Sequence, residues 1–254
     1  MSIAVEMAGG VMTLRFDRPA RKNAITAEMY AALADALMQA ERDPALRVIV
    51  MAGHAEAFTA GNDLEDFMQR PPLGDDAPVF RFLRAISACP KPLVASVSGV
   101  AVGIGTTLLL HCDLVYASET ARFSLPFVQL GLCPEAASST LLATVVGPRK
   151  AAELLMFGEP FTAQAALEMG LVNAVVPVAE LEAQVATRVA RLAALPAPSL
   201  RATKRLMKLQ QADAIAAQIA LEVEVFGRML REPSAKEAFA AFFEKRTPDF
   251  SAID

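Results

Sequence analysis

Apolar positions along the first half of the chain alternate between a strand-like and a helix-like pattern. The run Val11–Phe16 is short, rich in strand-forming residues and followed by the turn Asp17-Arg18-Pro19, so it predicts a β-strand. Thr26 then precedes apolar residues at helical spacing, which predicts a helix that is capped by Thr26 and runs to about Arg42. The buried stripe of that helix would consist of Met29, Leu33, Leu37 and Ala40.

The same alternation continues to about residue 117. It predicts further strands at residues 47–51, 93–97 and 113–117, a short helical turn at 64–68 and a helix at about 79–88. The glycine-containing segment 99–105 is expected to open another helix, which continues to residue 110. Because strands interleaved with helices pair in parallel, this order predicts an α/β core.

The last third of the chain has a different pattern. From about residue 179 onward it is almost entirely helical, with amphipathic helices expected at residues 201–211, 213–231 and 234–246 and interruptions at Pro196, Pro198 and Pro233. The apolar faces of these helices need a partner, which is either the core of the same chain or a neighbouring subunit.

Composition narrows the classes of function. The chain has 254 residues, of which 54% are apolar types, and a formal net charge of -4, so it can bury a sizeable core and offers no basic surface for a nucleic acid. Its 2 His and 3 Cys residues show no zinc-binding spacing, and we expect no metal and no cofactor. Neither a signal peptide nor a membrane span is predicted, so we expect a cytoplasmic protein.

Two glycine-containing segments, Phe58–Leu64 and Gly99–Gly105, each lie between a predicted strand and a predicted helix. If both face one cavity, their backbone N–H groups could bind a single oxygen on which negative charge develops, which is an oxyanion hole. The alternative is that the glycines only permit tight turns and close packing. The second segment is not a dinucleotide-binding loop, because Leu108 stands where a third glycine is required.

Glu135 is the strongest candidate for acid–base chemistry. It follows Pro134 and is expected to open a helix of small residues that continues into Leu141. A carboxyl among apolar neighbours would be partly desolvated, which raises its pKa and suits it to carry a proton. The alternative is a glutamate in a first helical turn that only complements the helix dipole. A triad of Ser96 or Ser98 with His111 and Asp113 lacks the GxSxG motif that would support it.

The order and spacing of these segments resemble the enoyl-CoA hydratase/isomerase (crotonase) superfamily. The matching motifs are Leu14–Pro19 with Asn23-Ala24, the AGxDL loop at Ala60–Leu64, the GxAxGxG loop at Gly99–Gly105, Cys112-Asp113, and Gly170-Leu171-Val172. The resemblance implies a spiral of strand–strand–helix (ββα) units over residues 1–195, a C-terminal helical trimerisation region over residues 196–254, and a homotrimer or a hexamer of paired trimers.

The resemblance also implies an acyl-CoA thioester as the substrate and assigns roles to residues by their place in the motifs. The oxyanion N–H groups would belong to Asn62 and Ile104, with Glu135 as the third catalytic residue. The substrate-binding residues would be Ala60, Gly61, Asn62, Asp63, Leu64, Gly103 and Phe127, with Lys22 as a candidate contact for the 3′-phosphate of CoA.

Three residues bear on which reaction of the superfamily the chain carries out. Members that hydrate enoyl-CoA resemble one another in two glutamates, and the matching positions here are Thr107 and Phe127. Glu135 instead stands where Δ3,Δ2-enoyl-CoA isomerases carry their single glutamate, and the segment Phe58–Phe67 also resembles the peroxisomal type of that isomerase. We therefore expect isomerisation of 3-enoyl-CoA to trans-2-enoyl-CoA in fatty acid β-oxidation. The alternatives are an enoyl-CoA hydratase and a non-catalytic acyl-CoA-binding module.

Overall fold

The computed structural model describes residues 2–72, 74 and 76–253, and it contains two β-sheets. The larger sheet has the strand order β1-β2-β3-β5-β7-β10. Its strands are β1 (Ile3–Ala8), β2 (Val11–Phe16), β3 (Val48–Ala52), β5 (Leu93–Val97), β7 (Leu114–Ser118) and β10 (Ala174–Val176). All neighbouring pairs from β2 to β10 are parallel, whereas β1 and β2 form an antiparallel hairpin. The parallel α/β core predicted from the sequence is confirmed.

The smaller sheet has the order β4-β6-β8-β9. Its strands are β4 (Ala57–Thr59), β6 (Val100–Val102), β8 (Arg122–Ser124) and β9 (Phe161–Thr162). Consecutive strands alternate between the two sheets, since β3, β5 and β7 join the larger sheet while β4, β6 and β8 join the smaller one. Helical segments follow each pair, so the core is the spiral of ββα units that the resemblance implies. The spiral brings the ends of β4 and β6, and the loops that follow them, next to each other.

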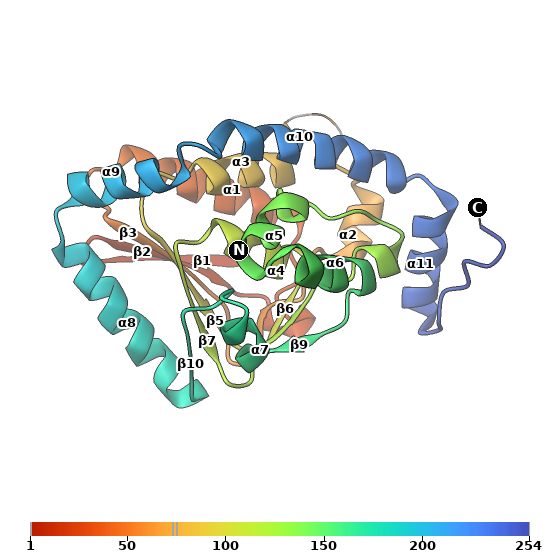
Figure 1. The fold of residues 1–254 in the computed structure, drawn as a ribbon, viewed down its shortest axis with the longest axis horizontal. Helices are drawn as coiled ribbons and strands as arrows, with labels where there is room; N and C mark the ends of the chain where they lie inside the picture. Colours follow the sequence, from red (N-terminus) through yellow and green to blue (C-terminus); the bar gives the residue numbers. More distant parts are fainter. Residues whose placement is uncertain (1, 73, 75, 254) are drawn as a thin grey trace.

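The helices lie around this spiral (Figure 1). Their bounds are α1 (Ala27–Arg42), α2 (Leu64–Gln69), α3 (Pro78–Ala88), α4 (Ile104–Thr107), α5 (Ser138–Val146), α6 (Pro148–Phe157), α7 (Ala163–Glu168), α8 (Val178–Ala194), α9 (Ala197–Lys208), α10 (Ala212–Met229) and α11 (Pro233–Glu244). Short 3₁₀ turns occur at η1 (Pro19–Arg21), η2 (Leu108–His111) and η3 (Val128–Leu130). No helix within the described residues is long and apolar enough to cross a bilayer.

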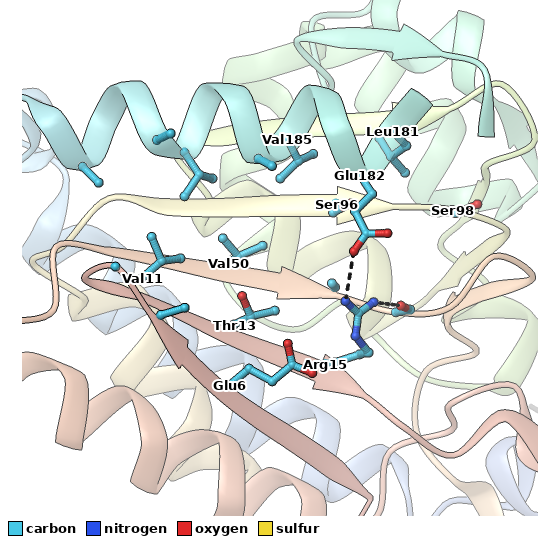
Figure 2. A pocket seen from close by; sticks show the side chains of 18 of the residues that line it. Glu6, Val11, Thr13, Arg15, Val50, Ser96, Ser98, Leu181, Glu182 and Val185 are labelled. Carbon is cyan, nitrogen blue, oxygen red and sulfur yellow. Dashed lines mark hydrogen bonds and ion pairs between the residues drawn. The ribbon is translucent and has the colours of Figure 1, made fainter. Parts of the chain in front are cut away.

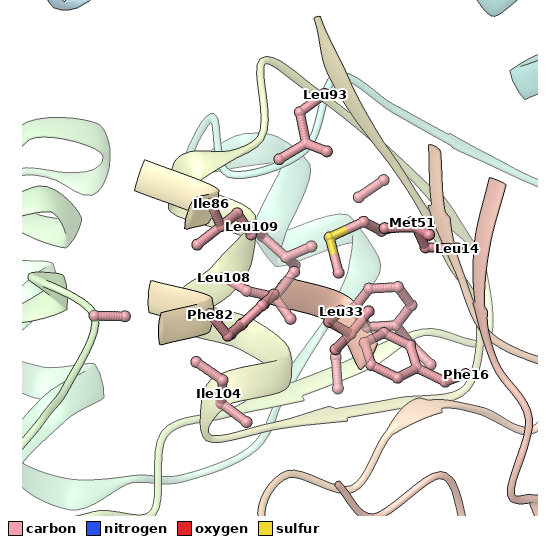
Figure 3. Close-up of a cluster of buried hydrophobic side chains, with 14 of the residues drawn as sticks. Leu14, Phe16, Leu33, Met51, Phe82, Ile86, Leu93, Ile104, Leu108 and Leu109 are labelled. Carbon is pink, nitrogen blue, oxygen red and sulfur yellow. The ribbon is translucent and has the colours of Figure 1, made fainter. Parts of the chain in front are cut away.

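The alternating side chains of β3 reach two separate clusters. Val48 and Val50 pack under α8, which lies along one face of the larger sheet (Figure 2). Ile49 and Met51 point to the other face, where α1 and α3 cover the main core (Figure 3). Because successive strand residues face opposite sides, a strand buried on both sides is apolar throughout, and all five residues of β3 are buried.

The C-terminal helices are attached to the core by buried polar contacts as well as by apolar packing. α10 packs along α3, at the top of Figure 1. On α9, the ammonium group of Lys204 contacts Asp113 Oδ2 at 2.7 Å and donates a hydrogen bond to the Lys91 carbonyl oxygen at 2.7 Å. Lys204 is only 7% exposed, so this cation anchors α9 to the end of the larger sheet.

Predicted boundaries of three helices are wrong. The helix expected at residues 201–211 is α9 (Ala197–Lys208), and Pro198 lies in its first turn instead of interrupting it, because a proline there leaves no needed N–H unpaired. The helix expected to run to residue 110 ends as an α-helix at Thr107 and continues as the 3₁₀ turn η2. Glu135 does not open α5, because Ala136 and Ala137 adopt left-handed backbone angles, with φ of 62° and 56°. A right-handed helix cannot continue through left-handed residues, so α5 begins at Ser138 and Glu135 lies in the turn before it.

Candidate active site

The two glycine-containing segments lie directly against each other. A Cβ atom on Gly61, whose φ is +88°, would lie 2.7 Å from the carbonyl oxygen of Val102. A Cβ atom on Gly105 would lie 2.7 Å from Thr59 Cγ2. Both distances are too short for any side chain, so these glycines are required by the approach of the loop after β4 to the loop after β6.

A cavity of about 900 Å³ opens where these loops meet. Its lining includes every residue that the sequence assigned to substrate binding or to the oxyanion hole: Lys22, Ala60, Gly61, Asn62, Asp63, Leu64, Gly103, Ile104 and Phe127. A group of phenylalanines from α10, α11 and the C-terminal segment completes the lining: Phe226, Phe239, Phe242, Phe243 and Phe250. The chain therefore brings the predicted binding residues together at one apolar cavity.

The backbone N–H groups of Asn62 and Ile104 have unused donor capacity. Within the described residues, neither of them donates a hydrogen bond to the protein, whereas Gly61, Asp63 and Gly103 next to them do. Gly61 donates to Thr59 Oγ1 at 3.1 Å, Asp63 to the Ile25 carbonyl at 2.9 Å, and Gly103 to the Ser124 carbonyl at 3.0 Å. Ile104 is the first residue of α4, where a helix leaves its N–H groups without an internal partner, and two unpaired donors at one cavity can receive a ligand oxygen.

Ile104 joins this cavity to the main core. The residue is 1% exposed, and its side chain packs beside Leu108 and Phe82 (Figure 3). Packing therefore fixes the position of the backbone at the start of α4, where the unpaired N–H lies.

Tyr30 is a residue of this site that the sequence analysis did not identify. It lies on the buried face of α1, is 3% exposed, and its hydroxyl donates a hydrogen bond to Asn62 Oδ1. The available signal was a tyrosine among the apolar positions of the predicted helix, because a buried tyrosine hydroxyl needs a partner. Tyr30 thereby links α1 to the loop that carries one of the two unpaired N–H groups.

Glu135 is buried next to this arrangement. The residue is 7% exposed and does not line the cavity, and one of its carboxyl oxygens accepts a hydrogen bond of 2.6 Å from the Thr107 hydroxyl. Burial raises the pKa of Glu135 to about 8; the Thr107 hydrogen bond opposes this rise and the nearby Glu222 carboxyl adds to it. The pKa of Tyr30 is raised by burial and also by the charge of Glu135, which places the phenol close to this carboxyl. A carboxyl with a pKa near 8 can both accept and return a proton near neutral pH.

Asp63 has a structural role in addition to lining the cavity. Its carboxylate accepts hydrogen bonds from the backbone N–H groups of Glu65 and Asp66, and so caps α2. Burial would raise the pKa of Asp63, but the hydrogen bond from Arg18 at 2.5 Å and the cap lower it overall. Asp63 therefore stays ionised and holds the loop in place.

The Ser–His–Asp triad is not assembled. His111 Nε2 lies 2.8 Å from the Ala136 carbonyl, which can only accept, so Nε2 carries the proton. Burial lowers the pKa of His111 to about 4, which makes it a neutral donor. Asp113 contacts Lys204, while Ser96 and Ser98 line a second cavity, of about 830 Å³, between the larger sheet and α8 (Figure 2). None of the residues predicted to bind acyl-CoA or to form the oxyanion hole lines that cavity.

No cluster of three or more metal-ligating side chains occurs in the described part of the chain. The groups that the structure does bring together are two unpaired N–H groups at the cavity and one buried carboxyl, a combination that suits charge stabilisation on a carbonyl oxygen and proton transfer at a neighbouring carbon.

Comparisons with known proteins place the chain among enzymes that are named for enoyl-CoA chemistry. The chain is 37% identical over 239 residues to enoyl-CoA delta isomerase 2 of Homo sapiens, a match that covers 91% of this chain and 60% of that protein. It is 36% identical over 246 residues to 2,3-dehydroadipyl-CoA hydratase of Escherichia coli, with 94% of each chain covered. This chain thus spans only about three fifths of the length of the human relative.

A solved structure gives the same fold. The crystal structure of an enoyl-CoA hydratase/isomerase from Pseudoalteromonas atlantica superposes with a TM-score of 0.94 at 41% identity, and covers 99% of this chain and 100% of that chain. The family model described as enoyl-CoA hydratase/isomerase matches residues 6–252. The protein belongs to the enoyl-CoA hydratase/isomerase family, and its fold is the crotonase fold.

Proposed function

We propose that the protein isomerises 3-enoyl-CoA thioesters to trans-2-enoyl-CoA, as a step of fatty acid β-oxidation. The observation that carries this proposal is one buried carboxyl, Glu135, which is hydrogen-bonded to Thr107 on α4, the helix that begins with the unpaired N–H of Ile104. Thr107 and Phe127 occupy the positions of the two hydratase glutamates and supply no carboxyl. The name of the human relative, enoyl-CoA delta isomerase 2, also supports the proposal.

The proposed mechanism needs one shuttle and no water. The N–H groups of Asn62 and Ile104 bind the thioester carbonyl oxygen, and ionised Glu135 removes a proton from the α-carbon of the acyl chain. The electron pair moves onto the carbonyl oxygen, where the two N–H groups stabilise the dienolate. Glu135 then returns the proton to the γ-carbon, so that the double bond becomes conjugated with the thioester and the base is regenerated.

The residues around the site suit this mechanism. The Thr107 hydroxyl donates to one oxygen of the Glu135 carboxylate, and the other oxygen accepts no hydrogen bond from the described residues. Phe127 is 4% exposed at the cavity, and its ring contributes to the exclusion of water from the reacting carbons. The exposed Lys22 at the cavity rim is our candidate contact for the 3′-phosphate, and the loop Ala60–Leu64 is our candidate for holding the rest of CoA.

A hydratase is the second candidate, because the Escherichia coli relative at 36% identity is named as one. Hydration requires a group that positions and deprotonates water, and Glu135 would have to perform that task alone. A non-catalytic acyl-CoA-binding module is the third candidate. Such a module would need no proton transfer, so the raised pKa of Glu135 would have no function in it.

The experiment is a pair of assays on the wild type and on Glu135→Gln. With 3-enoyl-CoA, the wild type should produce conjugated 2-enoyl-CoA, and the variant should bind the thioester but lose nearly all turnover. With crotonyl-CoA, the wild type should form no 3-hydroxy product. Efficient hydration would establish the hydratase instead, and tight CoA binding without either reaction would establish the binding module.

We also propose a homotrimer, or a hexamer of paired trimers, built through the helices after residue 195, with residues 1–195 as the catalytic core. The support is an exposed apolar cluster on α9 and the turn after it: Leu206, Met207 and Leu209 are 67%, 73% and 59% exposed. Light scattering should give a mass that is a multiple of three chains, and a monomer would contradict the assembly. All three cysteines are free thiols, which suits the cytoplasm as the proposed location.

A further inference from the structure

The turn that carries Glu135 has an unusual backbone. Ala136 and Ala137, the two residues after the carboxyl, are both left-handed, a conformation that residues with side chains rarely adopt. Two such residues in a row persist only where surrounding contacts hold them. The direction of the Glu135 side chain depends on this turn, because the turn sets the angle at which the chain leaves Glu135 for α5.

Glu222 holds the C-terminal half of the turn. Its carboxyl, on α10, accepts hydrogen bonds from the Ala137 N–H at 2.6 Å, from the Ser139 N–H at 3.1 Å and from the Ser139 hydroxyl. Gln218, one helical turn earlier on α10, donates to the same Ser139 hydroxyl at 2.9 Å. On the other side of the turn, His111 donates to the Ala136 carbonyl. Only a carboxylate offers enough acceptor sites for three donors at once.

Glu222 is itself buried. The residue is 5% exposed, and burial raises its pKa although the Ser139 and Ala137 hydrogen bonds oppose the rise. It is also the acidic group whose charge adds to the raised pKa of Glu135. Burial of a carboxyl costs free energy through lost hydration. The hydrogen bonds that offset this cost for Glu222 all go to the turn that carries the proposed base, Glu135.

We infer that Glu222 is a positioning residue, which fixes the left-handed turn so that Glu135 meets both the Thr107 hydroxyl and the substrate. This inference rests on the proposed function, since it gives Glu222 a task only if Glu135 transfers the proton. Through Glu222, which is 85 positions from Ala137 in the sequence, helix α10 would contribute to the position of the catalytic carboxyl.

The titratable and charged groups near Glu135 and Glu222 determine which group a pH–rate profile can detect. They are Tyr30, Cys133, His111 and the cation Arg228. Burial raises the pKa of Tyr30 well above 10 and that of Cys133 to about 11. Burial lowers the pKa of His111 to about 4. Tyr30, Cys133 and His111 do not change charge near pH 8, so a titration there belongs to Glu135, whose pKa is raised to about 8 chiefly by burial.

The test compares Glu222→Gln with Glu224→Gln, an exposed glutamate on the same helix, in the full chain. For Glu222→Gln we expect kcat for 3-enoyl-CoA to fall by about 10²-fold, the loss typical of a misplaced catalytic group, with little change in KM. The midpoint of its pH–rate profile should move to lower pH, by up to about one pH unit, because a neighbouring negative charge is lost. Ser139→Ala should give a smaller loss in kcat, and Glu224→Gln should match the wild type.

The outcomes separate the two ideas. An active wild type whose Glu222→Gln variant keeps both kcat and pH midpoint would overturn the positioning role and leave the proposed function intact. Equal losses in kcat and in CoA affinity, with no change in midpoint, would show a purely structural role and also overturn it. A wild type without isomerase activity would overturn the proposed function. In that case NMR titration of the Glu135 carboxyl, identified by its loss in Glu135→Gln, would show whether Glu222 still sets its environment.

Discussion

The hydrogen bond between Thr107 and Glu135 offers a quantitative test of the site. Within the described residues, Thr107 is the one hydrogen-bond donor to the Glu135 carboxyl. A hydrogen bond to a charged group contributes about 1.5–3 kcal/mol, and a change of one pH unit in a pKa corresponds to about 1.4 kcal/mol. Removal of the hydroxyl in Thr107→Val, which keeps the shape of the side chain, should therefore raise the pKa of Glu135 by about one to two pH units.

The assay is the pH dependence of kcat/KM for 3-enoyl-CoA, followed through the absorbance of the conjugated product. Because the base must be ionised to remove the proton, the wild-type rate should rise with pH through a midpoint near 8, the pKa of Glu135. In Thr107→Val the midpoint should move above 9, by the shift of about one to two pH units that the lost hydrogen bond predicts. At neutral pH the rate should fall roughly tenfold or more, since a smaller fraction of Glu135 is ionised.

Two variants serve as controls. Thr107→Ser keeps the hydroxyl and should keep the midpoint close to that of the wild type. Thr106→Val removes the neighbouring hydroxyl, which donates to the Ala101 carbonyl at 2.6 Å, so it should lower stability without a shift of the midpoint. An unchanged midpoint in Thr107→Val would show that the titrating group is not a carboxyl that is hydrogen-bonded to Thr107.

Three further predictions follow from the same geometry. In thermal unfolding, Glu135→Gln should be more stable than the wild type at pH 9, by up to a few kcal/mol, and the difference should vanish toward pH 5. The reason is that the pKa of Glu135 in the folded state, about 8, lies above its ordinary value of 4.5. The wild type therefore loses stability as the pH rises through this range. Gly61→Ala places a Cβ 2.7 Å from the Val102 carbonyl oxygen at a positive φ; it should cost at least about 1–2 kcal/mol in denaturant unfolding and lower kcat strongly, and a fully active variant would contradict the close approach of the loops. Tyr30→Phe removes the hydroxyl bonded to Asn62 and should lower kcat about tenfold with little change in KM, whereas a change in KM alone would argue against a role in the oxyanion loop.

The residues that repeat with a regular period were predictable, and those fixed by single long-range contacts were not. The strand Val11–Phe16 and the helix after Thr26 were confirmed to within one residue, because apolar periodicity reports directly on the faces that pack. The strands β4, β6 and β8 have three residues each and were missed, since so short a run carries no period of its own.

Some features of the candidate site were predictable from the sequence, and others depend on long-range contacts. The two loops were predictable because close approach demands glycine at Gly61 and Gly105, and residues of both loops line the cavity. The turn at Ala136 and Ala137 was not, since alanine gives no sign of a left-handed conformation that Glu222 imposes from another helix. Tyr30 and Asn62 are 32 positions apart, and only the fold brings them together.

The central claim is that Glu135 moves a proton within the acyl chain and adds no water. The most direct test is the mass of the product that the wild type forms from 3-enoyl-CoA, measured together with its absorbance until the reaction stops. The expected product has unchanged mass and has gained the absorbance of a conjugated enoyl thioester, and Glu135→Gln should form no such product. A product heavier by one water molecule would contradict the claim.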